Sequence, residues 1–104
     1  MDISELKNWT LSSYDEGTEH QLDYYINGQA RNVGDKAFLY YHEDKLLVEM
    51  QIVHIISRTN DIEAYDKLVE DENILCDRES EYGADTSAEF ITDNNCYLVW
   101  FRDV

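Results

Sequence analysis

The sequence contains no proline and only four glycines among its 104 residues. Glycine, asparagine and aspartate must therefore form its turns. The glycines, at positions 17, 28, 34 and 83, stand far apart, which excludes a glycine-rich loop that cradles phosphate. No apolar run approaches the roughly 20 residues that cross a membrane, and the first residues lack the basic start and apolar middle of a signal peptide. We therefore expect a cytoplasmic protein with a single domain over residues 1–104.

Cysteine and histidine are also scarce, with two and three residues respectively. Cys76 and Cys96 are too far apart for the paired spacing of zinc sites, and the histidines at positions 20, 42 and 54 have no partner at ligand spacing. The acidic residues after Cys76 disfavour a reactive thiolate. We predict that both cysteines pack in the fold as reduced thiols, and that the protein is not an enzyme and uses no cofactor or metal.

The scarcity of positively charged residues is the most informative feature of the composition. Eight Lys and Arg stand against 23 Asp and Glu, which gives a net charge of −15. A surface this acidic is repelled by nucleic acid and by anionic membranes, and it attracts basic proteins over long range. Disorder does not explain the composition, because the chain is 43% hydrophobic and contains eight tyrosines. The sequence therefore predicts a folded acidic domain with a basic partner.

Turn residues and alternating hydrophobicity predict most of the strands. Asn27-Gly28 suits a two-residue hairpin turn, so we expect a hairpin of strands at 20–26 and 29–33. A second hairpin joins 36–41 to a long strand at 46–57. In the long strand, Val48, Met50 and Ile52, continuing to His54 and Ile56, are expected on one face and the intervening residues, Ile55 included, on the other. A strand of this length usually bends or bulges.

Helical spacing appears after the long strand. Ile62, Tyr65, Leu68 and Val69 predict one main helix at about 61–70, with Asn60 or Asp61 as its N-cap. A helical turn within residues 1–7 and a short strand at 9–11 are expected at the start, an irregular segment at 71–86, and a closing hairpin of strands 88–92 and 96–101. The predicted fold class is α+β, a curved and mostly antiparallel sheet of about six strands with one main helix.

The acidic residues are concentrated in one part of the sequence. Eleven carboxylates lie between Asp61 and Glu89, against Lys67 and Arg78. A smaller group at positions 15, 16, 19 and 23 has no basic neighbour in sequence. A solvated face kept for solubility is the alternative explanation of such charge. If the two groups share one side of the molecule, their field would resemble that of a nucleic-acid backbone.

The acidic segment suggests one kind of metal site, a calcium-binding loop, because Asp77, Glu79 and Glu81 alternate as the ligands of an EF-hand loop do. The pattern then fails, because Tyr82 stands where the loop requires glycine and Ala88 where it requires the bidentate acid. The sequence does not support a specific calcium site.

The stretch from Ala30 to His42, which contains Gly34-Asp35, together with Val48 to Val53, resembles the glycine-aspartate turn, aromatic strand and return strand of PUA-like domains of the EVE or ASCH type. The resemblance covers about residues 30–57. It implies a small curved β-barrel that recognises nucleic acid, often a modified base, through a basic and aromatic surface. Eight basic residues in a chain of charge −15 depart from that pattern.

The leading hypothesis is an acidic inhibitor that occludes a basic nucleic-acid-handling protein by imitating nucleic acid. Immunity proteins against nuclease toxins, anti-restriction proteins and anti-CRISPR proteins all require such a surface. The alternatives are a PUA-like reader of nucleic acid or a modified base, and a small interaction module with incidental acidity. Tyrosine is frequent at interface hot spots, which makes two tyrosines candidate anchors beside the carboxylates. The predicted partner-binding residues are Tyr65, Asp66, Glu70, Asp71, Glu72, Asp77, Glu79, Glu81 and Tyr82.

Overall fold

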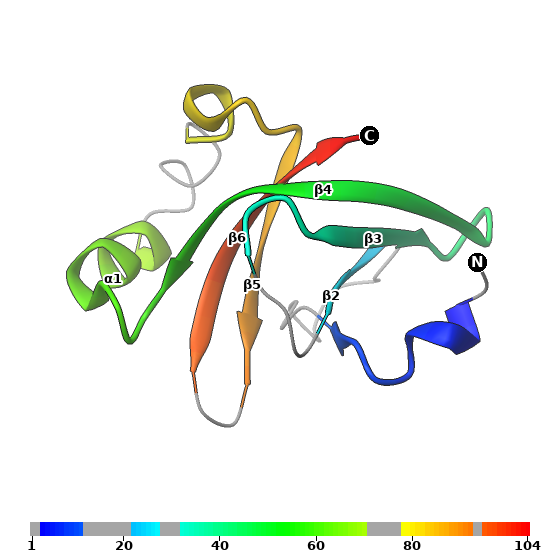
Figure 1. The fold of residues 1–104 in the computed structure, drawn as a ribbon, viewed down its shortest axis with the longest axis horizontal. Helices are drawn as coiled ribbons and strands as arrows, with labels where there is room; N and C mark the ends of the chain where they lie inside the picture. Colours follow the sequence, from blue (N-terminus) through cyan, green and yellow to red (C-terminus); the bar gives the residue numbers. More distant parts are fainter. Residues whose placement is uncertain (1–2, 12–21, 28–31, 71–77, 93–94) are drawn as a thin grey trace.

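The structure, a computed structural model, describes residues 3–11, 22–27, 32–70, 78–92 and 95–104. A short 3-10 helix, six strands and one main helix follow one another along the chain (Figure 1). Their bounds are η1 Ile3–Leu6, β1 Thr10–Leu11, β2 Leu22–Ile26, β3 Lys36–Tyr41, β4 Leu46–Ser57, α1 Ile62–Glu70, β5 Thr86–Ile91 and β6 Cys96–Asp103.

The six strands form one antiparallel sheet in the order β1-β2-β3-β4-β6-β5. The sheet curls until β2, the strand next to the β1 edge, approaches β5 at the other edge: the hydroxyl groups of Tyr24 in β2 and Thr86 in β5 lie 3.0 Å apart. The ring of Tyr24 also stacks on Phe101 of β6, with centroids 5.8 Å apart. The result is a nearly barrel-shaped sheet with one main helix outside it, which confirms the predicted α+β class.

Two hydrophobic clusters hold the sheet, one on each face. The inner cluster fills the curled sheet with alternate residues of β2 to β6 and includes Phe90 and Phe101, both fully buried. The outer cluster lies where α1 covers β4 and β6, and its centre is Trp100, also fully buried. Burial of each such side chain contributes about 1.5–3 kcal/mol to folding. β6 is therefore packed on both faces and flanked on both sides, by β4 and β5.

β4 contains the bulge that its length predicted. The register with β6 shifts between Ile52 and His54, so Val53 and His54 together oppose a single position. This shift moves every later side chain to the other face. The prediction that His54 and Ile56 continue the inner face was therefore wrong: Ile56 and Val53 pack in the outer cluster, whereas Ile55 packs against the inner one.

β2 does not form the expected hairpin with residues 29–33. It pairs with β3, with Ile26 opposite Ala37, and residues 32–33 are not a strand, while 28–31 lie outside the described residues. Two backbone hydrogen bonds tie the β2–β3 connection to β4 instead, from the Gly34 amide to the Ile52 carbonyl (2.8 Å) and from the Ile52 amide to the Asp35 carbonyl (2.9 Å). Gly34 has φ +97°, which a glycine adopts without strain.

Capping hydrogen bonds mark the start of α1 and the end of a second, short helix on the outer side of the sheet. The Asp61 carboxylate accepts the Ala64 amide at 3.1 Å and so caps α1, as predicted. Residues 78–82, expected to be irregular, are helical. This segment ends in a Schellman motif, in which the Ala84 amide bonds to the Glu79 carbonyl (2.8 Å) and the Gly83 amide to the Ser80 carbonyl (3.4 Å).

The N-terminal turn covers another part of the outer face. Leu6 of η1 is 2% exposed, and the ring of Trp9 meets Phe38 of β3 edge to face, with centroids 5.2 Å apart. The predicted helical turn and the short strand after it are both present, as η1 and β1.

Candidate functional site

Tyr65, one of the two expected anchors, lies in the interior. It is 3% exposed, and its hydroxyl donates a 2.5 Å hydrogen bond to the Glu89 carboxylate of β5. Burial, and then the bond to Glu89, raises the pKa of Tyr65 above its ordinary value. This side chain has no exposed surface to offer a partner, so Tyr65 is not an anchor. It belongs to the apolar pattern that predicted the helix, and that pattern forms the buried face of α1.

The second expected anchor, Tyr82, is partly buried. Its ring stacks on His54 with centroids 3.9 Å apart and meets Trp100 at 5.0 Å, so it holds the 78–82 helix to the sheet. The same stack accounts for His54, whose pKa is lowered mainly by burial, while the Glu81 carboxylate works in the opposite direction. Tyr82 is partly exposed, so it remains a candidate contact for a partner.

Three of the expected acidic residues have contacts within the molecule. Arg58 pairs with Asp66 (3.1 Å), Arg78 pairs with Glu81 (2.6 Å), and the Ser87 hydroxyl donates to Glu79 (2.9 Å). Each side chain of the two ion pairs is more than two-fifths exposed, so the pairs contribute little to stability.

The remaining expected carboxylates are exposed or not described. Glu70 at the end of α1 is exposed. Asp71, Glu72 and Asp77 lie outside the described residues, as do positions 15, 16 and 19 of the smaller group.

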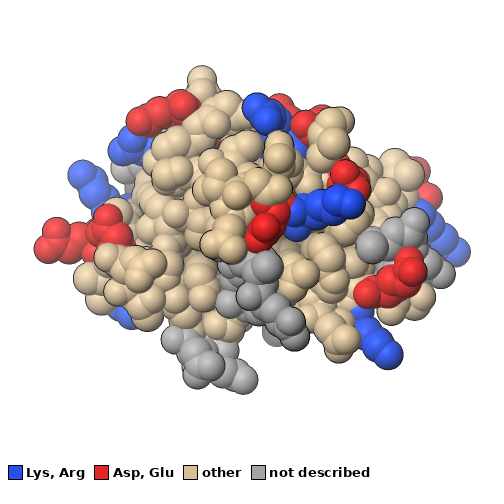
Figure 2. Space-filling view, viewed as in Figure 1, with Lys and Arg blue, Asp and Glu red and all other residues tan. Residues whose placement is uncertain are grey.

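α1 and the 78–82 helix lie on the same side of the sheet. Both pack on the outer cluster around Trp100, and Figure 1 shows them on the same side of the curled sheet. The two helices and the capping residue bring six carboxylates to that side, where the basic residues are Arg58, Lys67 and Arg78. The carboxylates are Asp61, Glu63, Asp66, Glu70, Glu79 and Glu81. On the face that Figure 2 presents, acidic and basic side chains are interspersed around a large uncharged area.

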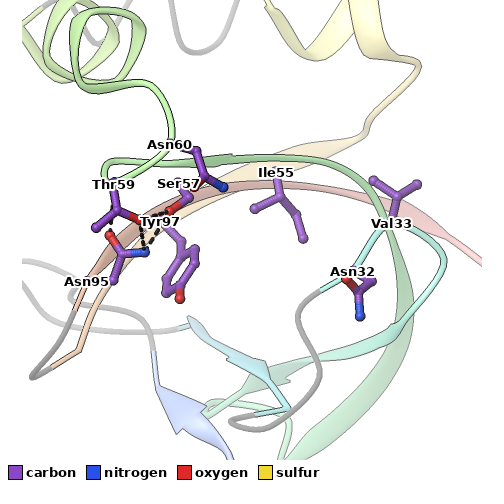
Figure 3. Close-up of a pocket in the computed structure, with 8 residues that line it drawn as sticks. All are labelled: Asn32, Val33, Ile55, Ser57, Thr59, Asn60, Asn95 and Tyr97. Carbon is purple, nitrogen blue, oxygen red and sulfur yellow. Dashed lines mark hydrogen bonds between the residues drawn. The ribbon is translucent and has the colours of Figure 1, made fainter.

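A pocket of about 450 Å³ opens at one end of the curled sheet (Figure 3). Its floor consists of Ile55 and Ser57 of β4 and Tyr97 of β6, whose side chains point to the inner face. The β2–β3 connection and the turn between β4 and α1 form two of its sides, and the β5–β6 hairpin completes it. The residues that these segments contribute are Asn32 and Val33, Thr59 and Asn60, and Asn95.

One wall of the pocket is a hydrogen-bonded network centred on Asn95. Its amide nitrogen donates to the hydroxyl oxygens of Ser57 (2.6 Å) and Thr59 (2.9 Å). Its amide oxygen accepts the backbone amides of Thr59 (3.3 Å) and Cys96 (2.8 Å). The side chain of Asn95 is thereby fully engaged, and the wall is held in a defined geometry before any ligand arrives.

The described residues contain few other groups that could take part in catalysis or bind a metal. His42 in the β3–β4 turn lies 2.6 Å from the Asp23 carboxylate, with Tyr40 against its ring, and this is their one histidine–carboxylate pair. No group of three or more His, Cys, Asp or Glu side chains is placed to hold a metal ion in this part of the chain. Cys96 packs in the outer cluster with its thiol free, and Cys76 is not described. Among the helices described, none has the length and apolar character needed to cross a membrane.

The sequence did not point to the pocket. Its residues come from four separate segments, and the bulge in β4 decides that Ile55 and Ser57 face inward. The one available signal was the run of uncharged polar residues Ser57, Thr59 and Asn60 at the end of an otherwise apolar strand. Comparisons of the chain with models of protein families, with curated proteins and with solved structures find no match.

Proposed function

We propose that this protein is an acidic inhibitor that binds and occludes a basic nucleic-acid-handling protein, in the manner of immunity, anti-restriction or anti-CRISPR proteins. The observation that carries the proposal is the placement of α1 and the 78–82 helix on one hydrophobic cluster, which gathers their carboxylates on one side of a chain of charge −15. A cationic groove that binds phosphates would accept such a surface.

The mechanism is steering followed by steric occlusion. The net charge attracts a basic protein over long range and speeds its association, and contacts at close range then hold the complex. Glu63 and Glu70 of α1 are exposed, and Tyr82 of the 78–82 helix is partly exposed, so it adds an amphipathic side chain to the same side of the sheet. No cofactor takes part.

The nucleic-acid reader is the weaker proposal, because it needs a cationic surface. The structure describes seven Lys and Arg, and three of them, Lys36, Arg58 and Arg78, form ion pairs with carboxylates of the same chain. The described surface therefore offers few free cations to a polyanion. A reader would be retained on immobilised nucleic acid at low salt, whereas the proposed inhibitor would not.

A capture experiment tests the proposal. The immobilised protein is expected to retain a basic nuclease or other nucleic-acid-binding protein from a lysate at low salt and to release it at high salt. The double variant Glu63→Lys/Glu70→Lys should weaken this capture. The control is Glu43→Lys/Asp44→Lys in the exposed β3–β4 turn, which makes the same change of net charge at the end of the sheet away from α1 (Figure 1).

The two double variants separate a local site from bulk charge. Equal weakening by both would reduce the interaction to nonspecific attraction, as expected of a module with incidental acidity. If the wild-type protein captures no basic protein at low salt, the inhibitor proposal is wrong.

A further inference from the structure

The pocket exists because β3 is shorter than β4. β3 begins at Lys36, opposite Gln51, whereas β4 runs on to Ser57, and β6 is the one strand of the described residues that pairs with it there. Beyond Ile52 the chain before β3 turns away along the connection that Gly34 and Asp35 tie to β4. The inner face at Ile55, Ser57 and Tyr97 is therefore left open as a hollow of about 450 Å³, within the usual size range of small-molecule sites.

The lining of this hollow carries no charge. Of the residues in the whole chain, 30% are charged, yet none of the eight described residues around the pocket is an acid or a base that ionises near neutral pH. Among the described lining residues an anionic ligand would find no cation and a cationic ligand no carboxylate, and the net charge of −15 would repel the anion. The pocket is therefore suited to an uncharged ligand.

The Asn95 network leaves one hydroxyl proton for such a ligand. The hydroxyls of Ser57 and Thr59 both accept from Asn95, and the 2.9 Å bond between them uses the proton of only one. The other proton has no acceptor among the described residues, so it is available to a ligand carbonyl. This donor sits on a rigid wall, so little ordering is needed when it is used.

Two side-chain amides lie at the two ends of the pocket rim. Asn32 comes from the β2–β3 connection and Asn60 from the turn before α1, and Figure 3 shows them at opposite ends of the pocket rim. Both residues are exposed, and neither side-chain amide has a hydrogen-bond partner among the described residues. Each amide both donates and accepts, which matches a ligand that presents N–H and C=O groups side by side.

We propose that this pocket binds an uncharged planar amide, a flat ring that carries a carboxamide or a lactam edge. The ring lies over the apolar surface of Ile55 and the ring of Tyr97. Its carbonyl accepts the hydroxyl proton of the Ser57–Thr59 pair, and its remaining polar atoms meet Asn32 or Asn60. This site is independent of the proposed inhibitor function and stands on the other face of β4 and β6 from α1.

A titration followed by two-dimensional ¹H–¹⁵N NMR tests the site with nicotinamide as the probe. We expect millimolar nicotinamide to shift the signals of Ser57, Thr59 and the Asn32 and Asn60 side-chain amides. Nicotinate has the same ring with a carboxylate in place of the amide, and it should bind at least tenfold more weakly. Absence of shifts with nicotinamide, or equal binding of nicotinate, would overturn the proposal.

Variants assign the binding to the residues named. The exposed pair Asn32→Ala/Asn60→Ala should weaken nicotinamide binding about tenfold, as the loss of one or two hydrogen bonds predicts. Asn8→Ala, at an exposed asparagine after η1, is the matched control and should bind as the wild type does. Unchanged affinity in the double variant would contradict the site.

A second pair of probes distinguishes a free uncharged ligand from a base of a nucleic acid as the source of the amide. Uridine presents a lactam edge on an uncharged molecule, and oligouridylate presents the same edge on a polyanion. We expect uridine to bind and oligouridylate to bind more weakly per base. Tighter binding of the oligonucleotide would overturn the proposal of a free uncharged ligand. Glu63→Lys/Glu70→Lys should leave uridine binding unchanged, which separates this test from that of the inhibitor.

Discussion

The hydroxyl of Tyr65 donates to the carboxylate of Glu89 at 2.5 Å and joins α1 to β5 across the outer side of the sheet. Because Tyr65 is almost completely buried, this bond forms away from bulk water. Removal of its hydroxyl donor should therefore lower the free energy of unfolding more than removal of an exposed one. Tyr65→Phe keeps the ring and removes only the hydroxyl. We expect it to lower the free energy of unfolding by about 1–3 kcal/mol, measured by urea denaturation at neutral pH.

The control for this substitution is Tyr41→Phe, at a tyrosine that is 37% exposed. The structure shows no hydrogen bond from its hydroxyl to another described residue, so the loss should change stability by less than about 0.5 kcal/mol. Equal effects of the two substitutions would show that the Tyr65–Glu89 bond does not stabilise the fold.

The same bond predicts a loss of stability in alkali. Burial and the bond to Glu89 raise the pKa of Tyr65 in the folded protein, whereas an unfolded tyrosine ionises near its ordinary pKa of about 10. Above that pH the unfolded chain has lost the proton and the folded protein keeps it, so this contribution to stability falls as pH rises from about 10. The difference in stability between wild type and Tyr65→Phe should therefore shrink between pH 9 and pH 11. A constant difference across that range would contradict the raised pKa.

The lowered pKa of His54 predicts a loss of stability in mild acid. Burial lowers the pKa of His54 in the folded protein, so the unfolded chain takes up a proton first as pH falls through about 6.5. Stability present above that pH is then lost as pH falls toward the folded pKa. His54→Phe keeps an aromatic ring against Tyr82 and Trp100 and cannot titrate.

Urea unfolding of wild type and His54→Phe at pH 7.5 and pH 5.5 measures this effect, because the carboxylates titrate alike in both proteins. The wild type should lose up to about 1.4 kcal/mol per pH unit relative to the variant. Parallel pH profiles, or a wild type that gains stability in acid relative to the variant, would contradict the lowered pKa of His54.

Local signals predicted the elements whose partners are near in sequence. The β3–β4 and β5–β6 hairpins, α1 and its Asp61 cap follow from alternation, helical spacing and turn residues within each segment. The β2–β3 pairing did not follow, because Asn27-Gly28 favours a tight turn locally, whereas in the structure nine residues separate the end of β2 from the start of β3, and Ile26 pairs with Ala37. Hydrogen bonds from Gly34 and Asp35 to β4, which no local pattern reveals, set that register.

The candidate sites, too, could be predicted from the sequence only in part. The concentration of carboxylates is visible in the sequence, but the burial of Tyr65 and the ion pairs of Asp66 and Glu81 depend on which face of each helix meets the sheet. The pocket depends on a one-residue bulge that turns Ile55 and Ser57 inward. Such a shift changes no residue type, so the sequence carries little trace of it.

Gly83 supplies a prediction about the helix that carries Tyr82. It has φ +70° at the end of the 78–82 helix, where the Schellman motif requires the left-handed conformation. A Cβ at this position would meet no atom within 4 Å, so the cost of a substitution comes from the backbone alone. Gly83→Ala should lower the free energy of unfolding by about 1 kcal/mol, even though alanine also restricts the unfolded chain. Gly83→Asn should cost less, because asparagine tolerates this conformation better. Urea denaturation of the two variants checks the order, and an alanine variant as stable as the wild type would show that residue 83 does not hold the left-handed conformation in solution.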